Sequence, residues 1–234
     1  MSQLSKQEFI NFFKYYKNES QQEAGIAILY EQMRDVLKTA DHDWVTTYRT
    51  KPTVVTTNPL DVPYQSQNDN ASGTGQRECF SSSCAMVAMY YGKIENDDAY
   101  NLVREKYGDS TDAQAQVRAL RSLGLEANFI SNGSTNDLRD AIDAGRPVPC
   151  GWLHHGPASA PSGGGHYSVL IGYTGSAWIM NDPNGEASLS KGGYTNNMDG
   201  SNQSYSFKNW NPRWIVEGEG SGWYMDVRDP SVKK

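Results

Sequence analysis

The chain has 234 residues, of which 37% are hydrophobic and 21% charged, a composition typical of a folded globular protein rather than a disordered or fibrous one. Its 21 Lys and Arg against 27 Asp and Glu leave a net charge of −6, so we expect no basic face and no nucleic-acid partner. A secretory signal is not evident, and no run of about 18 apolar residues predicts a membrane span. These features predict synthesis in the cytoplasm without membrane insertion.

Two amphipathic helices are predicted near the N-terminus. Apolar residues recur every three or four positions from Lys6 to Leu37, and Ser20 with Glu23 has the spacing of a capping box at the start of the second helix. Residues 50–60 are rich in threonine and proline and have no helical period, which indicates a linker. We therefore expect a small helical unit at residues 1–51 and a second domain at residues 52–234.

The second domain is predicted to begin with helices and to end with strands. Helices are expected over 81–90, 99–107, 112–123 and 135–144, and a glycine closes each of them. Strands are expected over 148–153, 167–173 and 177–181, followed by a tail of short strands and long loops over 185–224. Helices followed by strands indicate an α+β fold.

The segment from His166 to Asp182 has the pattern of a β-hairpin, with two β-like runs on either side of Thr174 and Gly175. A turn centred on residue 174 places His166 directly opposite Asp182 in the antiparallel pair. Directly opposed residues have Cβ atoms about 4.5–5.5 Å apart, close enough for a carboxylate to hold an imidazole by a hydrogen bond. Such a pair is the base half of a nucleophilic triad.

Cys79 is the candidate nucleophile for this triad. It lies just before the serine-rich start of an apolar helix, where free N–H groups and the helix dipole stabilise a thiolate and lower its pKa. Cys84 and Cys150 lie inside apolar segments and are predicted to be core residues. Three cysteines are an odd number, which argues against a disulfide framework.

Three blocks of the sequence together resemble the papain-like cysteine peptidases related to the bacteriocin-processing peptidases. They are Cys79-Phe80-Ser81-Ser82-Ser83-Cys84-Ala85-Met86-Val87, then Gly165-His166-Tyr167-Ser168-Val169-Leu170-Ile171-Gly172-Tyr173, then Asn181-Asp182-Pro183-Asn184-Gly185. The resemblance spans about residues 61–185. It implies a papain-like fold, with helices packed on an antiparallel sheet, and a catalytic triad of Cys79, His166 and Asp182.

The resemblance also implies a glutamine that donates a hydrogen bond into the oxyanion hole. Gln67 is the favoured residue and Gln65 the alternative, because residues 68–75 form a long insertion before the nucleophile. Phe80 stands where the family often has a glycine. Phe80, Trp152 and Gly165 are predicted to bind substrate.

No metal and no cofactor are predicted. His154 and His155 form a metal pair with His166 only if they share a face, whereas adjacent residues of an extended chain point to opposite faces. The loop at 182–186 lacks the ligand spacing of an EF-hand calcium site, and a tight turn is favoured there.

Three further features leave alternatives open. The glycine-rich loop at 156–165 is either a mobile lid on the cleft or a plain connection. The aromatic residues of the tail either fill a core or bind a sugar or peptide polymer. Glu217 and Glu219 are a weak candidate for a glycosidase pair, because nothing sets them on opposite sides of a substrate.

These observations predict a thiol-dependent peptidase. The absence of an exporter segment and the aromatic, amide-rich tail favour an endolysin-like enzyme that cuts peptidoglycan cross-link peptides at the cell wall. The alternatives are a non-catalytic module that binds cell wall or peptide, and an amidase that cuts the sugar-to-peptide bond with the same triad. The oligomeric state stays open.

Overall fold

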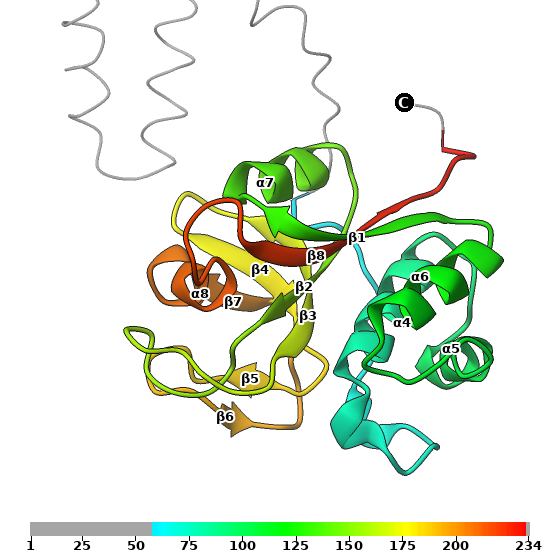
Figure 1. The fold of residues 1–234 in the computed structure, drawn as a ribbon, viewed down its shortest axis with the longest axis horizontal. Coiled ribbons are helices and arrows are strands. Elements are labelled where there is room, and N and C mark those ends of the chain that lie inside the picture. The colour runs from blue at the N-terminus through cyan, green and yellow to red at the C-terminus, as the bar shows by residue number, and fades with distance from the viewer. Residues whose placement is uncertain (1–57, 233–234) are drawn as a thin grey trace, which may run out of the picture. The chain divides into compact units, whose positions relative to one another are not determined.

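The structure is a computed structural model that describes residues 58–232, so the predicted N-terminal helical unit at 1–51 lies outside the described residues. The described part has an α+β fold, as predicted, in which helices pack on an antiparallel sheet (Figure 1). Its helices are η1 (Gln67–Asp69), η2 (Gly75–Arg77), α4 (Cys79–Tyr90), α5 (Asp97–Arg104), α6 (Ala113–Ser122), α7 (Thr135–Asp143) and α8 (Phe207–Trp214).

The main sheet has six strands in the order β1-β8-β2-β3-β4-β7, and all neighbouring strands are antiparallel. A small second sheet pairs β5 with β6. Helices α4, α5 and α6 form a group on one side of the main sheet, and α8 lies on the other side (Figure 1). The strands are β1 (Glu126–Gly133), β2 (Val148–Trp152), β3 (His166–Tyr173), β4 (Ala177–Asn181), β5 (Glu186–Ala187), β6 (Tyr194–Asn196), β7 (Gln203–Ser206) and β8 (Gly222–Arg228).

Helix α4 is the central helix of the core. Every residue from Phe80 to Ala88 is buried, which agrees with the apolar character of this segment, and the helix packs on β2 and β3. It begins at Cys79, two residues earlier than the sequence predicts. This earlier start places the thiol in the first turn of the helix.

Helices α5, α6 and α7 form where the sequence predicts them, because each has a polar residue that caps its first turn. Asn96, Asp112 and Ser134 accept hydrogen bonds from the backbone of α5, α6 and α7 respectively. Ser134 and Asp137 form a complete capping box at the start of α7. These caps fix the residues at which α5, α6 and α7 begin.

Two elements differ from the predicted order of helices followed by strands. Strand β1 lies between α6 and α7, and helix α8 lies in the tail that was predicted to hold strands and loops. Helix α8 forms despite an internal Pro212, because Trp210 and Trp214 stack on each other with ring centroids 5.5 Å apart and are buried. Of the tail's aromatic residues, Tyr205 is buried with them, whereas Trp223 is 55% exposed.

The register of the β3–β4 hairpin also differs from the prediction. Val169 pairs with Asn181, so a continued ladder would place Asp182 opposite Ser168 rather than His166. The difference arises because the turn is centred between Gly175 and Ser176, where Tyr173 pairs with Trp178, rather than on Thr174. A bulge between Leu170 and Gly172 adds a residue to β3 and offsets only part of this difference. His166 and Asp182 are therefore diagonal neighbours on one face, a separation that long side chains can bridge.

The segment before η1 crosses the ends of these strands and is bound to them. Leu60 N–H donates to the carbonyl of Ile171, and Gln67 N–H donates to the carbonyl of Pro183. The Asn181 side chain donates to the carbonyl of Val62. These bonds place residues 60–67 beside the end of β4, where Asp182 follows.

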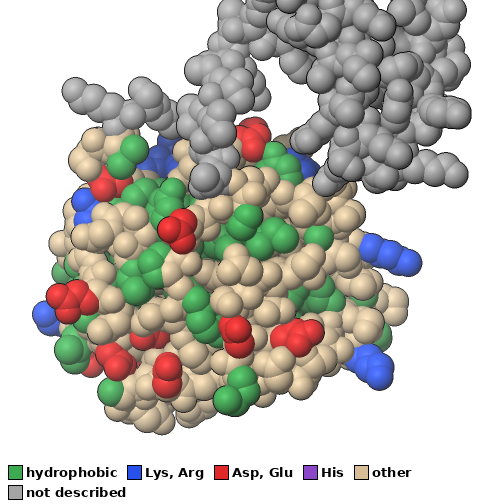
Figure 2. All heavy atoms as spheres, turned by 180° about the vertical axis from the view of Figure 1, so that it is seen from behind, with side chains coloured by type: hydrophobic (Ala, Val, Ile, Leu, Met, Phe, Trp, Pro, Cys, Tyr) green, Lys and Arg blue, Asp and Glu red, His purple; other side chains and the backbone are tan. Residues whose placement is uncertain are grey.

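Carboxylates are scattered over the molecular surface that Figure 2 shows, among small apolar areas, and the Lys and Arg side chains in view stand at its margins. The described residues on this face form no continuous basic patch. Within residues 58–232, no helix has both the length and the apolar composition that a membrane crossing requires.

Candidate active site

Cys79 is the first residue of α4, and its side chain is half-buried. The N–H groups of a first helical turn lack intrahelical acceptors, and the helix dipole is positive there, so a thiolate is stabilised. The Cys79 backbone N–H itself has no hydrogen-bond acceptor among the described residues. The position thus combines a half-buried thiol with a free donor beside it.

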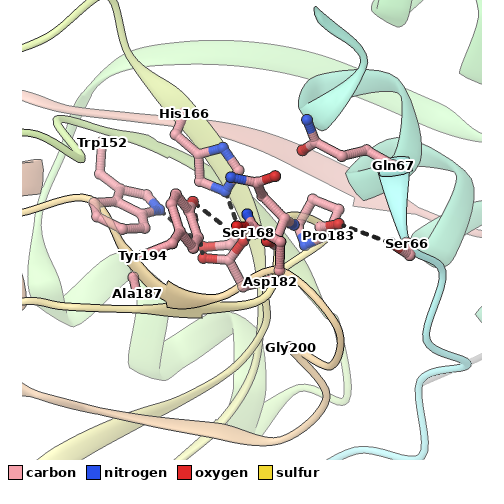
Figure 3. Close-up of polar contacts among 12 residues, drawn as sticks. Ser66, Gln67, Trp152, His166, Ser168, Asp182, Pro183, Ala187, Tyr194 and Gly200 are labelled. Atoms are coloured by element: carbon pink, nitrogen blue, oxygen red, sulfur yellow. Dashed lines mark hydrogen bonds and ion pairs between the residues drawn. The ribbon is translucent and has the colours of Figure 1, made fainter. Parts of the chain in front are cut away.

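His166 and Asp182 form a buried hydrogen-bonded pair. The distance from His166 Nε2 to Asp182 Oδ1 is 2.7 Å, and the two side chains are 4% and 0% exposed (Figure 3). The predicted contact is therefore present, although the predicted register is not. Because Asp182 occupies Nε2, the other ring nitrogen, Nδ1, is left to serve the thiol.

Three tyrosines that sequence reasoning missed hold Asp182 in place. Tyr205 donates a 2.8 Å hydrogen bond to Asp182 Oδ2, and the Tyr194 hydroxyl lies 3.4 Å from both carboxylate oxygens. Tyr64 donates to the Asp182 backbone carbonyl at 3.1 Å. The Asn184 N–H adds a 3.0 Å bond to Oδ1. Both oxygens of this buried carboxylate are therefore satisfied.

The electrostatics of Cys79 and His166 favour a thiolate–imidazolium pair. Burial alone would raise the pKa of Cys79, but the charge and hydrogen bond of His166 outweigh it and lower that pKa below its usual value. Burial alone would lower the pKa of His166, but the charges of Asp182 and Cys79 raise it well above its usual value. Both shifts favour the charged forms of the pair.

Gln67 lies in η1 and is 3% exposed. Its Nε2 donates to the carbonyl of Gly75 at 2.9 Å, which leaves the second amide hydrogen free, and its Oε1 is buried without a partner. Figure 3 shows this side chain extending from η1 towards the side where His166 lies. Gln65 instead donates to the Tyr64 carbonyl and accepts from the Asp97 N–H, so its amide is engaged elsewhere.

A buried carboxylate organises the insertion between Gln67 and Cys79. Glu78 is 2% exposed and precedes the thiol directly. Its oxygens accept hydrogen bonds from the side chains of Asn70, Ser72, Thr74 and Asn101, at 2.6 to 3.2 Å. Burial would raise the pKa of Glu78, but these bonds lower it below its usual value. The insertion is therefore an ordered loop whose polar side chains converge on one carboxylate.

The thiol opens into a cleft of about 630 Å³. The three residues predicted to bind substrate, Phe80, Trp152 and Gly165, all line it. Phe80 is 1% exposed and stacks on Tyr167, with ring centroids 3.6 Å apart. Trp152 is 2% exposed and lies edge-on to His166, with ring centroids 5.5 Å apart. Both rings thus contact protein chiefly, and their contact with substrate stays a prediction.

The other cysteines have core environments. Cys84 and Cys150 are 0% exposed, and burial raises the pKa of each thiol far above its usual value. Neither is suited to form a thiolate, which leaves Cys79 as the candidate nucleophile among the described cysteines.

The histidine pair does not diverge as predicted. The rings of His154 and His155 lie 3.9 Å apart, because the chain leaves β2 and turns into the loop at 156–165 between them and His166. Burial, with the charges of His166 and His155, lowers the pKa of His154 to about 4. Among residues 58–232, no cluster of three His, Cys, Asp or Glu side chains is arranged to hold a metal ion.

The glycine-rich loop borders the cleft. His155 and Ser162 exchange two backbone hydrogen bonds that close the loop, and Gly163, Gly164 and Gly165 line the cleft beyond this closure. The loop therefore forms part of the cleft wall. Both predicted roles, a mobile lid and a plain connection, agree with this position.

A model of the Peptidase_C39 like family matches residues 59–213, which is more than half of the chain. The chain belongs to the Peptidase_C39 like family. It is therefore a cysteine peptidase, as the three sequence blocks predict. The matched region contains Gln67, Cys79, His166 and Asp182.

Two solved structures are similar to this C39-like peptidase. A double glycine motif protease from an AMS/PCAT transporter, in complex with the leader peptide, is 20% identical with a TM-score of 0.47, covering 74% of this chain and 96% of that chain. The peptidase domain of Streptococcus ComA, a bi-functional ABC transporter, is 21% identical with a TM-score of 0.43, covering 65% and 91%. At these values neither structure assigns a substrate to this chain. No curated protein matches it.

The C39-like peptidase should carry a thiolate at Cys79 below the usual thiol midpoint of about pH 8.5. Iodoacetamide alkylation of Cys79, followed by mass spectrometry against pH, should therefore persist well below that midpoint. Asp182→Asn should lower the pKa of His166, remove its positive charge near neutral pH and move the alkylation midpoint upward. Asp61→Asn, at an exposed site, is the control; equal midpoints for wild type and Asp182→Asn would refute the pairing.

Tyr205→Phe should remove the hydrogen bond to Asp182 while keeping the ring that packs on Trp152. One hydrogen bond to a charged group contributes about 1.5–3 kcal/mol, so we expect Cys79 alkylation near neutral pH to slow by about 10- to 100-fold. Tyr173→Phe is the matched control, because its hydroxyl bonds to Asp143 at the surface. Equal slowing in both variants, or in neither, would show that Tyr205 does not position Asp182.

Proposed function

We propose that Cys79, His166 and Asp182 are the catalytic triad of this C39-like peptidase, with Gln67 in the oxyanion hole. The observation that carries the proposal is a thiol at the start of α4 that lines the cleft and interacts with a buried, carboxylate-bound imidazole. The lowered pKa of Cys79 and the raised pKa of His166 support their proposed roles as nucleophile and proton donor.

In the first step, the Cys79 thiolate attacks the carbonyl carbon of the peptide bond and forms a C–S bond, which places the charge on the carbonyl oxygen. His166 then gives its proton to the leaving amine as the C–N bond breaks. A thioester on Cys79 and a neutral imidazole remain. Water attacks the thioester while His166 accepts a proton, and the acid product leaves as thiolate and imidazolium are restored.

The charged oxygen needs donors that are already in place. The Cys79 backbone N–H has no other acceptor among the described residues, and Gln67 has one free amide hydrogen. Gly75 keeps Gln67 in position, because a Cβ atom at Gly75 would lie 2.0 Å from the Gln67 carbonyl oxygen. The oxyanion hole proposed here therefore depends on a glycine outside the triad.

The proposed substrate is a cross-link peptide of peptidoglycan, cut at the cell wall as an endolysin would cut it. The form of the cleft supports this substrate. Gly163, Gly164 and Gly165 give a wall without side chains, where a peptide backbone can approach closely. Trp223 offers an exposed ring to the peptide or to an adjoining sugar.

Cys79→Ala should abolish hydrolysis, by about 10⁴-fold or more, because it removes the attacking atom. Cys84→Ala, five residues further along the same helix, should retain activity. Digestion of purified peptidoglycan, followed as loss of turbidity, compares the two variants. Unchanged digestion by the Cys79 variant would reject the triad.

Mass spectrometry of the products should show new peptide amino termini within the cross-links. Release of intact stem peptides from the sugar would instead identify an amidase. Binding to peptidoglycan without products would identify the non-catalytic module. Cleavage of a double-glycine leader peptide but not of peptidoglycan would contradict the proposed substrate while leaving the triad in place.

A further inference from the structure

Among residues 58–232, the lining of the cleft offers a substrate one accessible fixed charge besides Cys79. Among the described residues that line it, Arg213 and Glu217 carry formal charges. Arg213 is 1% exposed, and its guanidinium donates to the backbone carbonyls of Leu153, His155, Gly156 and Leu189. All its donor groups are engaged by the protein, so Glu217 is the charge that a substrate meets.

Glu217 is exposed, and its carboxylate has no hydrogen bond or ion pair with any residue in 58–232. Its backbone is nevertheless fixed, because its N–H donates to Ser221 Oγ, and that hydroxyl donates to the Gly218 carbonyl at 2.7 Å. The nearby Glu219 differs, since its carboxylate accepts from the N–H and hydroxyl of Thr135. Glu217 is therefore held at the cleft with its charge uncompensated.

Trp223 also lines the cleft, near the start of β8. It is opposite Gly151 of β2 in the sheet and packs edge-on to Phe129, with ring centroids 6.2 Å apart. The indole is 55% exposed although it lines the cleft, and Val216 beside Glu217 is 55% exposed as well. An indole face attracts cations, and an apolar surface next to it suits the aliphatic stem of a long basic side chain.

We infer that Glu217 and Trp223 form a specificity subsite for an ammonium or guanidinium group of the peptide substrate. The inference rests on the proposed peptidase function and adds the chemical class of side chain that the cleft selects. The carboxylate pairs with the cation, and the indole covers its stem. Neither residue takes part in the bond-breaking steps, so the subsite acts on substrate binding.

The test uses quenched fluorescent peptides in sets of three that differ only in carrying Lys, Gln or Glu at one position. A separate set is made for each position on either side of the cleaved bond. Wild-type protein should cut the best Lys peptide with about 10-fold higher kcat/KM than its Gln counterpart, chiefly through KM. Glu217→Gln should remove this preference, and Glu217→Lys should reverse it in favour of the Glu peptide. Trp223→Ala should weaken binding of the Lys peptide.

Glu105→Gln removes an exposed carboxylate that does not line the cleft, and it should leave the preference unchanged. Equal cleavage of the Lys, Gln and Glu peptides by wild-type protein would overturn the inference while the peptidase function stands. Peptide binding to Cys79→Ala, measured by fluorescence anisotropy, is independent of catalysis. Tighter binding of the Lys peptide that is lost in Glu217→Gln would support the subsite even if no peptide were cut. Equal binding of the Lys, Gln and Glu peptides would overturn it.

Discussion

The 2.7 Å hydrogen bond between His166 and Asp182 is the interaction on which the site depends. It joins the first residue of β3 to the residue that follows β4, and both side chains are buried. Removing one partner of a buried charged pair typically costs about 3–5 kcal/mol, because the other charge is left without compensation. The bond also fixes which ring nitrogen faces the thiol, so it determines orientation and ionisation together.

The rest of the fold brings two distant parts of the chain to this bond. The helical layer supplies Cys79 at the start of α4, and the sheet supplies the imidazole and the carboxylate. The segment at 60–67 joins them, because it is hydrogen-bonded to β3 and to Pro183 while Gln67 reaches the insertion before α4. The cleft at Cys79 is consequently lined by residues of both layers.

Much of the site could be predicted from the sequence, because the types and order of Cys79, His166 and Asp182 have few other chemical interpretations. The register of the hairpin could not be predicted, since Thr174, Gly175 and Ser176 are all common turn residues and the sequence does not show which of them is central. The bulge in β3 adds a further offset that the sequence does not show either. Tyr205 was predicted only to fill a core or to bind a polymer, because only the folded sheet brings β7 to Asp182. Helix α8 was missed because Pro212 and its aromatic neighbours have no helical signal of their own.

The buried carboxylate of Glu78 has a consequence for the spacing of the site. The insertion at 68–75 is folded back on that carboxylate by the side chains of Asn70, Ser72 and Thr74, so its two ends are held together. The distance along the chain between oxyanion donor and nucleophile is thereby decoupled from their distance in space. Loss of the Glu78 carboxylate would leave Asn70, Ser72 and Thr74 without their shared acceptor and would release the tie between these two parts of the chain.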